Sequence, residues 1–392
     1  MGNQLKIRQA LKECLRKFIL PAAYRLCCLK YGKPDRQLIV FADAHHQAFP
    51  EDMRLLKEEL QRRGYKTREL VHDFSEVSFG SSVKAMLSFL NYYAQAGMVV
   101  LCDYYLPVIS VKKRKETKVI QLWHACGAYK KFGYDARDDL LSVKDQNMFC
   151  NFDLVSVSSE QCRSVYAKAF HLPLEKVQAL GVSRTDRYFS EPFMECCRTR
   201  FFKEYPEAAG KKIILWAPTF RKNAGEGTLI NAEAIDSLCE KLSGEWFVIR
   251  KVHPHLEKKM EASNCKIPTE QLYAAADLLI TDYSSVIFDF ALTKKPILIY
   301  APDRIEYEQE RGFYLKLEEL PAQVVTTGEE LIKVIEEGEY QTASERYEKF
   351  IENQLQMCDG HATRRIADYI TDMQNEITGE GTAAHQNRRN GG

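Results

Sequence analysis

The sequence predicts an α/β protein of two domains, each built on a parallel β-sheet. Its 392 residues are more than one hydrophobic core of ordinary size accommodates. From Gln37 onward, short apolar runs alternate with helical patterns; the alternation stops at the charged segment Tyr188–Lys211 and then resumes. Strands that alternate with helices are typical of parallel βαβ units. We therefore expect two Rossmann-like domains whose parallel sheets face a central cleft, because ligands bind beyond the carboxyl ends of such strands.

The first domain is predicted over residues 35–190. The helix Glu51–Arg63 is closed by Gly64, and the uncharged stretch Ala85–Cys102 is interpreted as a helix ending near Gly97 and then a buried strand. That stretch has too many polar side chains for a membrane span, so no transmembrane helix is predicted. The predicted strands are Gln37–Ala42, Tyr65–Val71, Met98–Cys102, Lys118–Trp123, Asp153–Val157 and Val177–Leu180.

The second domain is predicted over residues 191–376, with Tyr188–Lys211 as a less regular connection. Residues 377–392 are polar and rich in glycine, and we expect them to be disordered. The predicted strands are Ile213–Ala217, Trp246–Val252, Asp277–Thr281 and Pro296–Tyr300, and the predicted terminal helices are Gly328–Glu336, Ala343–Gln356 and Ala362–Glu376.

Residues 1–34 form a separate basic segment. Its apolar residues recur at helical spacing, and its charges are nearly all positive. A basic amphipathic helix of this kind lies in an anionic membrane surface; the alternative is a surface helix that packs its apolar face on the body. The basic residues are Lys6, Arg8, Lys12, Arg16, Lys17 and Arg25, and the apolar residues include Leu11, Leu15, Phe18 and Ile19.

Charge and cysteine content narrow the possible partners and location. Lys plus Arg number 55 against 54 for Asp plus Glu, a balance that argues against nucleic acid as a partner. The twelve cysteines have no C-x-x-C spacing, and no secretory signal precedes them. We therefore expect a cytoplasmic protein without structural disulfides, peripheral on the inner face of the membrane.

Two histidines directly follow predicted strands. His124 comes after Val119–Trp123, and an imidazole at a strand end is suited to proton transfer near neutral pH. His253 follows Arg250 at the end of another strand, where a cation and an imidazole suit a phosphate group. The alternatives are a structural histidine at the first position and a solvated strand end at the second.

A third turn carries Asp282, Ser284, Ser285 and Asp289. Exposed N–H groups at the start of the predicted helix, together with two hydroxyl groups, form an anion site. Asp289 lies one turn further along and is placed to bond ribose hydroxyls. The alternative is that Asp282 and Ser284 only cap the helix.

Two further turns offer groups for phosphate. The strand Ile213–Ala217 leads into Thr219 and Arg221, and a turn that begins at Gly181 contains Arg184. No cluster of carboxylates requires a metal ion.

Together these turns resemble the CDP-glycerol glycerophosphotransferase family of teichoic acid primases and polymerases. The resemblance spans about Gln37 to Ile370 and implies the GT-B fold. Two positions depart from the family's pattern, Ala125 where glycine is usual and Ser183 where proline is common. The matching elements, in the family's order, are Trp123-His124-Ala125, Gly181-x-x-Arg184-x-Asp186, Ala217-Pro218-Thr219-x-Arg221, His253-Pro254, the run from Leu279 to Asp289, and Asp359-Gly360.

The resemblance implies a reaction and a division of roles. An acceptor hydroxyl, on a lipid-linked saccharide or a polyol phosphate chain, attacks the β-phosphorus of CDP-glycerol and expels CMP. His124 is the implied base, and His253 is the second implied catalytic residue, which holds the pyrophosphate and stabilises the leaving CMP. Asp289 binds ribose. No cofactor or structural metal is implied, while assistance by Mg²⁺ stays open. The implied pyrophosphate and donor ligands are His253, Arg184, Thr219, Arg221, Arg250, Asp282, Ser284 and Ser285.

Other functions share this architecture. A CDP-ribitol ribitolphosphotransferase differs only in the alditol, whereas a nucleotide-sugar glycosyltransferase or a UDP-sugar 2-epimerase uses a different donor. A non-catalytic nucleotide-binding scaffold is disfavoured because both histidines and the Thr281–Ser285 turn are intact.

Overall fold

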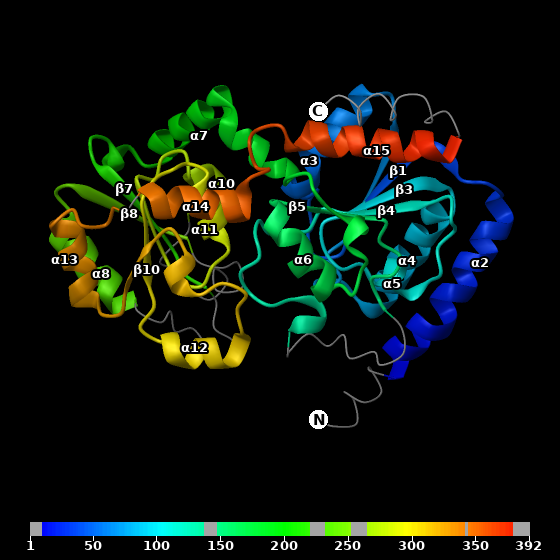
Figure 1. Ribbon diagram of the computed structural model, residues 1–392, viewed down its shortest axis with the longest axis horizontal. Helices are drawn as coiled ribbons and strands as arrows, with labels where there is room; N and C mark the ends of the chain where they lie inside the picture. The colour runs from blue at the N-terminus through cyan, green and yellow to red at the C-terminus, as the bar shows by residue number, and fades with distance from the viewer. Residues whose placement is uncertain (1–9, 137–146, 220–231, 252–264, 342–343, 379–392) are drawn as a thin grey trace.

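The computed structural model describes residues 10–136, 147–219, 232–251, 265–341 and 344–378. These residues form two α/β domains that lie side by side (Figure 1). Each domain contains one sheet, and every named strand pair in both sheets is parallel. The predicted fold of two Rossmann-like domains is therefore confirmed.

The first sheet has six strands in the order β2-β1-β3-β4-β5-β6. The strand order reverses between β1 and β3, because β2 lies on one side of β1 and the later strands follow on the other. This is the topological switch point, where ligands bind in open parallel sheets. The strands are β1 (Asp35–Asp43), β2 (Lys66–Val71), β3 (Ala96–Leu101), β4 (Lys118–Gln121), β5 (Leu154–Val157) and β6 (Val177–Ala179). The helices of this domain include α3 (Glu51–Arg62), α4 (Phe79–Tyr93), α5 (Leu106–Ser110) and α6 (Glu160–Ala169).

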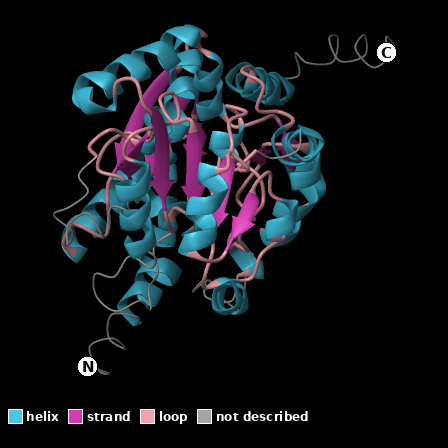
Figure 2. Ribbon diagram, turned by 90° about the vertical axis from the view of Figure 1, so that its left-hand side faces the viewer, coloured by secondary structure: helices cyan, strands magenta, loops and turns pink. Residues whose placement is uncertain are grey.

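The second sheet has five strands in the order β11-β10-β9-β7-β8, with its switch point between β7 and β9. Figure 2 shows strands between helices on both faces. The strands are β7 (Lys212–Ala217), β8 (Trp246–Arg250), β9 (Leu278–Thr281), β10 (Ile297–Tyr300) and β11 (Gln323–Val325). The helices are α7 (Glu191–Glu204), α8 (Ala232–Leu242), α10 (Thr269–Leu272), α11 (Val286–Ala291), α12 (Arg304–Arg311), α13 (Gly328–Glu336) and α14 (Ser344–Leu355).

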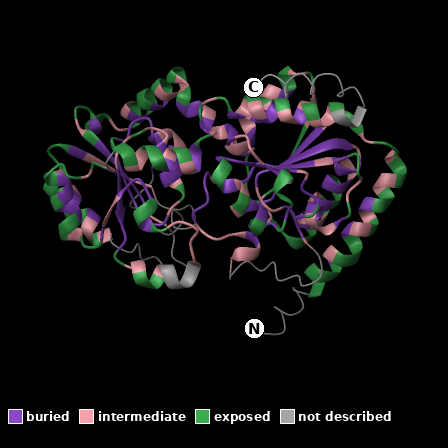
Figure 3. Ribbon diagram, viewed as in Figure 1, coloured by how far each residue is buried: buried purple, intermediate pink, exposed green. Residues whose placement is uncertain are grey.

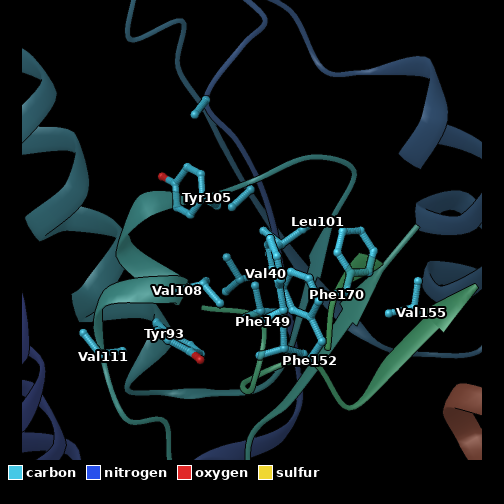
Figure 4. Close-up of a cluster of buried hydrophobic side chains, with 14 of the residues drawn as sticks. Val40, Tyr93, Leu101, Tyr105, Val108, Val111, Phe149, Phe152, Val155 and Phe170 are labelled. Carbon is cyan, nitrogen blue, oxygen red and sulfur yellow. The ribbon is translucent and has the colours of Figure 1, made fainter. Parts of the chain in front are cut away.

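The core of each domain follows from strands that are apolar on both faces. All six residues of β3 are buried, as is typical of parallel strands covered by helices on both sides (Figure 3). In the first domain, valine and leucine side chains from the sheet pack against an aromatic group that contains Phe149, Phe152 and Phe170 (Figure 4). Close packing of this kind fixes the sheet edge on which the polar residues described below lie.

Three local expectations were wrong. The segment predicted to be less regular contains the helix α7, and the short strand β11 was not predicted. The helix before Gly97 ends at Tyr93, and Gly97 lies inside β3. A Cβ atom on Gly97 would stand 2.7 Å from the Cα atom of Arg36, so β1 approaches β3 closely only because this residue has no side chain.

The last helix, α15 (Ala362–Thr378), does not stay with the second domain. It crosses back and lies along the first domain beside α3 (Figure 1). Its buried residues Ile366, Ala367 and Ile370 join the core that contains Met53, Leu56 and Leu60 of α3. The prediction that residues 191–376 form one domain is corrected at this helix. The predicted disorder of the tail concerns residues that lie almost entirely outside the described ranges.

The described part of the basic N-terminal segment is helical from residue 10 through α2 (Leu20–Tyr31) and lies on the outer side of the first domain (Figure 1). A five-residue π-helical stretch, Leu15–Ile19, precedes Pro21. Proline cannot donate a hydrogen bond, and its ring would clash with the carbonyl group of Lys17 in a regular helix, so the turn widens. Among the described residues, no helix is both long enough and apolar enough to cross a membrane.

We predict that Gly97→Ala lowers the free energy of unfolding by about 1–3 kcal/mol, because the added methyl group overpacks the contact between β1 and β3. Gly80→Ala is the matched control, since a Cβ atom there meets nothing within 4 Å and alanine favours the helix by up to about 1 kcal/mol. Denaturant unfolding of both variants measures the difference. Equal stabilities of the two variants would contradict the packing argument.

Candidate active site

Polar residues gather at the carboxyl ends of three neighbouring strands of the first sheet. Asp43 ends β1, Asp103 follows β3, and His124 follows β4. These strands are adjacent in the sheet, with β3 in the middle. The side chains therefore meet at the switch point of the sheet.

The backbone before His124 turns sharply at Trp123. Trp123 has a φ of 61°, a left-handed conformation that is uncommon for a bulky residue. Its N–H donates to Oε1 of the buried Gln121 at 2.9 Å, and its indole ring stacks on the imidazole of His124 with ring centroids 4.4 Å apart. The surrounding contacts hold this turn, which leaves the His124 side chain 45% exposed at the strand end.

Asp103 orients His124. Nδ1 of His124 lies 3.3 Å from Oδ2 of Asp103. Burial lowers the pKa of His124, but the hydrogen bond and the negative charge of Asp103, with a smaller contribution from Asp52, outweigh it and raise the pKa above its ordinary value. The pKa of Asp103 is lowered, because the bond to His124 outweighs its burial. An Asp–His pair of this geometry leaves Nε2 of His124 as the proton acceptor.

The loop that follows His124 reaches the second domain. Gly127 has a φ of 63°, and a Cβ atom there would stand 2.0 Å from the ring of Phe288 in α11. The backbone N–H of Gly127 donates to Oγ of Ser158, and that of Ala128 donates to Oε1 of Gln354 in α14. His124 is thus held at the junction of the domains.

The second sheet contributes a turn at its own switch point. Oδ1 of the buried Asp282 accepts from the backbone N–H of Thr219 at 2.8 Å and from that of Tyr283. Oγ1 of Thr281 donates to the carbonyl oxygen of Ala217 at 2.6 Å. Asp282 therefore ties the loop after β7 to the loop after β9.

Two hydroxyl groups begin the short helix α11. Ser285 is exposed, and Oγ of the half-buried Ser284 accepts weakly from the N–H of Val286 at 3.4 Å. With only six residues, α11 adds little dipole, so the two hydroxyl groups would be the main donors at an anion site here.

Arg184 and Asp289 bond to each other. Nη2 of Arg184 lies 3.0 Å from each carboxylate oxygen of Asp289, and Nη1 bonds Oδ1 of Asp52 in the first turn of α3. Arg184 is 11% exposed, Asp52 16% and Asp289 12%. Both residues were predicted as substrate ligands, and that role stays a prediction; in the structure they belong to a buried ion triad that joins the domains.

The remaining predicted residues are dispersed or undescribed. Nη2 of Arg250 lies 2.5 Å from Oδ1 of Asp236, so the guanidinium points to α8. His253 and Arg221 lie outside the described residues, and their predicted roles stay predictions. Among the described residues, no set of three or more His, Cys, Asp or Glu side chains is arranged to hold a metal ion.

Comparison with known proteins identifies the family. The family model of CDP-glycerol:poly(glycerophosphate) glycerophosphotransferases matches residues 25–372. The chain belongs to this glycerophosphotransferase family. The family predicted from the ordered motifs is thereby confirmed.

Two curated relatives and one solved structure illustrate the likeness. The chain is 31% identical over 379 residues to a teichoic acid poly(ribitol-phosphate) polymerase of Bacillus spizizenii, covering 90% of this chain and 58% of that protein. It is 28% identical over 403 residues to a teichoic acid glycerol-phosphate primase of Bacillus subtilis, covering 94% of this chain and all of the primase. A variant of the wall teichoic acid polymerase TagF superposes with a TM-score of 0.75 at 19% identity, over 96% of this chain and 100% of that one. This likeness shows the GT-B fold.

Several motif residues of the glycerophosphotransferase family have a structural role in this protein. Both carboxylate oxygens of Asp186 accept from the backbone N–H groups of Ala362 and Thr363, and so cap α15. Gly181 and Gly360 have φ of 93° and 87°, and a side chain on Gly181 would meet the carbonyl oxygen of Met357 at 2.2 Å. The Gly-x-x-Arg-x-Asp and Asp-Gly motifs therefore build the point where α15 leaves the second domain.

Sequence reasoning missed Asp103 and Asp43. Each stands at or just after the end of a buried strand, which is a usable signal because the ends of neighbouring parallel strands meet. The signal identifies the edge of the sheet but not which side chain each carboxylate contacts.

We predict that Asp103→Asn lowers the pKa of His124, because the neutral amide no longer favours the imidazolium form. An NMR titration of the His124 ring protons measures the shift directly. Asp368→Asn, on the outside of α15, is the control and should leave that pKa unchanged. An unaltered His124 pKa in Asp103→Asn would mean that the pair has no electrostatic role.

Proposed function

We propose that the protein transfers an alditol phosphate from a CDP-alditol to a hydroxyl group of a teichoic-acid-like acceptor and releases CMP. The observation that carries the proposal is the His124–Asp103 pair. It lies at the junction of the two domains of a GT-B fold, in a member of the glycerophosphotransferase family. In this architecture the first domain contributes the base, and the strand ends of the second domain hold the donor.

The reaction moves one proton and exchanges one P–O bond. Nε2 of His124 takes the proton of the acceptor hydroxyl as its oxygen attacks the β-phosphorus of the donor. A bond from the acceptor oxygen to phosphorus forms, the bond from the β-phosphorus to the bridging oxygen breaks, and CMP leaves with the electron pair. Asp103 keeps Nδ1 protonated and stabilises the imidazolium that results. Positioning and charge stabilisation supply the rest of the catalysis.

The donor side relies on groups of the second domain. Ser284, Ser285 and the backbone around Thr219 are the described candidates for the pyrophosphate, with His253 and Arg221 as further candidates. Asp289 remains a candidate for the ribose as well as a member of the domain junction, because each of its oxygens contacts Arg184 and can accept a further hydrogen bond. No prosthetic group takes part in this scheme; Mg²⁺ bound with the pyrophosphate would add charge stabilisation.

Either glycerol or ribitol fits the alditol position. The relatives named above include a ribitol-phosphate polymerase at 31% identity and a glycerol-phosphate primase at 28% identity. CDP-ribitol is therefore a second candidate donor beside CDP-glycerol.

We further propose that the N-terminal helix rests on an anionic membrane surface, where a lipid-linked acceptor would be found. Leu15, Leu20 and Tyr24 are buried against the body. Among the described residues, eleven large apolar side chains are exposed, and five of them lie on this helix, interleaved with exposed cations such as Lys12 and Arg25. The five are Leu11 (47% exposed), Phe18 (69%), Ile19 (47%), Leu26 (67%) and Leu29 (82%). An outer face of this composition fits an interfacial helix.

His124→Ala should lower kcat by about 10²–10⁴-fold, the usual contribution of a general base, while CDP binding changes little. CMP release in the presence of acceptor measures the rate, and calorimetry with CDP measures the binding. His361→Ala, an exposed histidine before α15, is the matched control. A His124→Ala enzyme that retains activity within a few-fold of wild type would make His124 structural.

Replacing Leu11, Phe18, Ile19, Leu26 and Leu29 together by serine should release the protein from anionic vesicles without unfolding it, because the inner face of the helix stays apolar. The basic residues contribute about 1 kcal/mol each near such a surface, so the remaining binding should fall as salt rises. Co-sedimentation at low and high salt tests both points, with exposed Leu174→Ser as control. Undiminished sedimentation of the five-fold variant would exclude the membrane role.

A further inference from the structure

A second Asp–His pair lies beside the first. Asp43 ends β1, and the turn that follows contains His45 and His46; the mechanism proposed above uses none of the three. Nε2 of His45 lies 3.9 Å from Oδ2 of Asp103, the same oxygen that contacts His124. Because both contacts end on one atom, His45 and His124 are neighbours.

The side chain of His46 is held as firmly as that of His124. Nδ1 of His46 lies 2.9 Å from Oδ1 of Asp43, whose side chain is fully buried. The same oxygen accepts from the backbone N–H groups of His45 and His46, both at 2.8 Å. His46 nevertheless remains 47% exposed, and its Nε2 atom bonds none of the described residues.

The carboxylates around this turn are each engaged by a basic side chain. Asp103 is paired with His124, Asp52 with Arg184, and Asp43 with His46. The bond from Asp43, the principal cause, raises the pKa of His46 against the opposing effect of burial, and the charges of Asp43, Asp52 and Asp103 act in the same direction. Each of these carboxylates thus already contacts a basic side chain, and the half-exposed ring of His46 offers a donor at Nε2 in its protonated form, which Asp43 favours.

We propose that His46, assisted by His45, binds a phosphate group of the acceptor next to the hydroxyl that His124 deprotonates. This inference rests on the proposed function and names a subsite for its second substrate. The phosphate is either the last phosphodiester of a growing polyol phosphate chain or the diphosphate of the lipid carrier, since both present the same oxygen acceptors.

The position of the pair favours the acceptor over the donor. His45 and His46 extend from the first sheet beside the base, whereas the candidate donor groups follow the strands of the second sheet. Among the described residues no set of three or more His, Cys, Asp or Glu side chains is arranged to hold a metal ion, and the protonated form of His46, which Asp43 favours, offers a donor to an anion. A charge-assisted hydrogen bond of this kind is among the stronger ones in proteins.

Calorimetric titration of the full chain with a glycerol phosphate trimer, without donor, tests the subsite independently of turnover. His46→Ala should weaken binding by about 10- to 100-fold, the range for hydrogen bonds to charged groups, while His361→Ala should bind like wild type. Asp43→Asn keeps an oxygen for the backbone N–H groups but removes the charge. This variant should bind the trimer more weakly. Binding is lost as pH rises, and in the variant that loss should occur at a lower pH, because the His46 imidazolium loses its proton at a lower pH without the charge of Asp43.

Parallel titration with a short-chain prenyl diphospho-disaccharide distinguishes the two phosphate sources. A larger effect of His46→Ala on the trimer assigns the subsite to the polymer, and a larger effect on the diphosphate assigns it to the carrier. Unchanged affinity of His46→Ala for both probes, with unaltered thermal unfolding, would overturn the inference. That result would leave the proposed transfer reaction intact, because wild-type turnover of a CDP-alditol is a separate measurement.

Discussion

The guanidinium group of Arg184 lies between two carboxylates from opposite domains, Asp52 and Asp289. A charge this deeply buried is tolerated only when it is paired and hydrogen-bonded, and removal of one partner leaves an uncompensated charge. Arg184 meets both conditions: it forms a two-oxygen contact with Asp289, an ion pair with Asp52, and a contact to the thiol of Cys126 in the loop after His124. The relative position of the two sheets and of the loop after His124 depends on this triad.

The rest of the junction is built around the same point. Gly127 passes directly over Phe288, one residue before Asp289, and Asp186, two residues beyond Arg184, caps the helix that returns to the first domain. Residues far apart in the chain thereby fix the place where the ends of both sheets meet. The first domain presents two imidazoles oriented by carboxylates there, and the second presents hydroxyl and backbone N–H groups. This division suits a reaction in which the acceptor must be deprotonated on one side and a diphosphate held on the other.

The sequence was sufficient for the fold and for the position of His124 at a strand end. Parallel strands produce apolar runs separated by helices, and a histidine directly after such a run has to lie at the functional edge of the sheet. Contacts between residues that are distant in the chain could not be predicted from the sequence. Arg184 and Asp289 are 105 residues apart, and the local sequence pattern did not indicate that they bond to each other. The return of α15 was missed for the same reason, since its amphipathic pattern shows that a face is buried but not which domain buries it. Glycine is typical of a helix end, which is why Gly97 was expected near one. In the structure, the close approach of Arg36 requires glycine at this position of β3.

Product analysis tests the central claim most directly. The purified protein is incubated with CDP-glycerol or CDP-ribitol and a lipid-linked acceptor analogue. The masses of the products are then determined by mass spectrometry. The account predicts equal amounts of CMP and of acceptor that is heavier by one alditol phosphate, with one of the two donors preferred. Turnover of a UDP-sugar in free solution, with no alditol phosphate added to any acceptor, would contradict it.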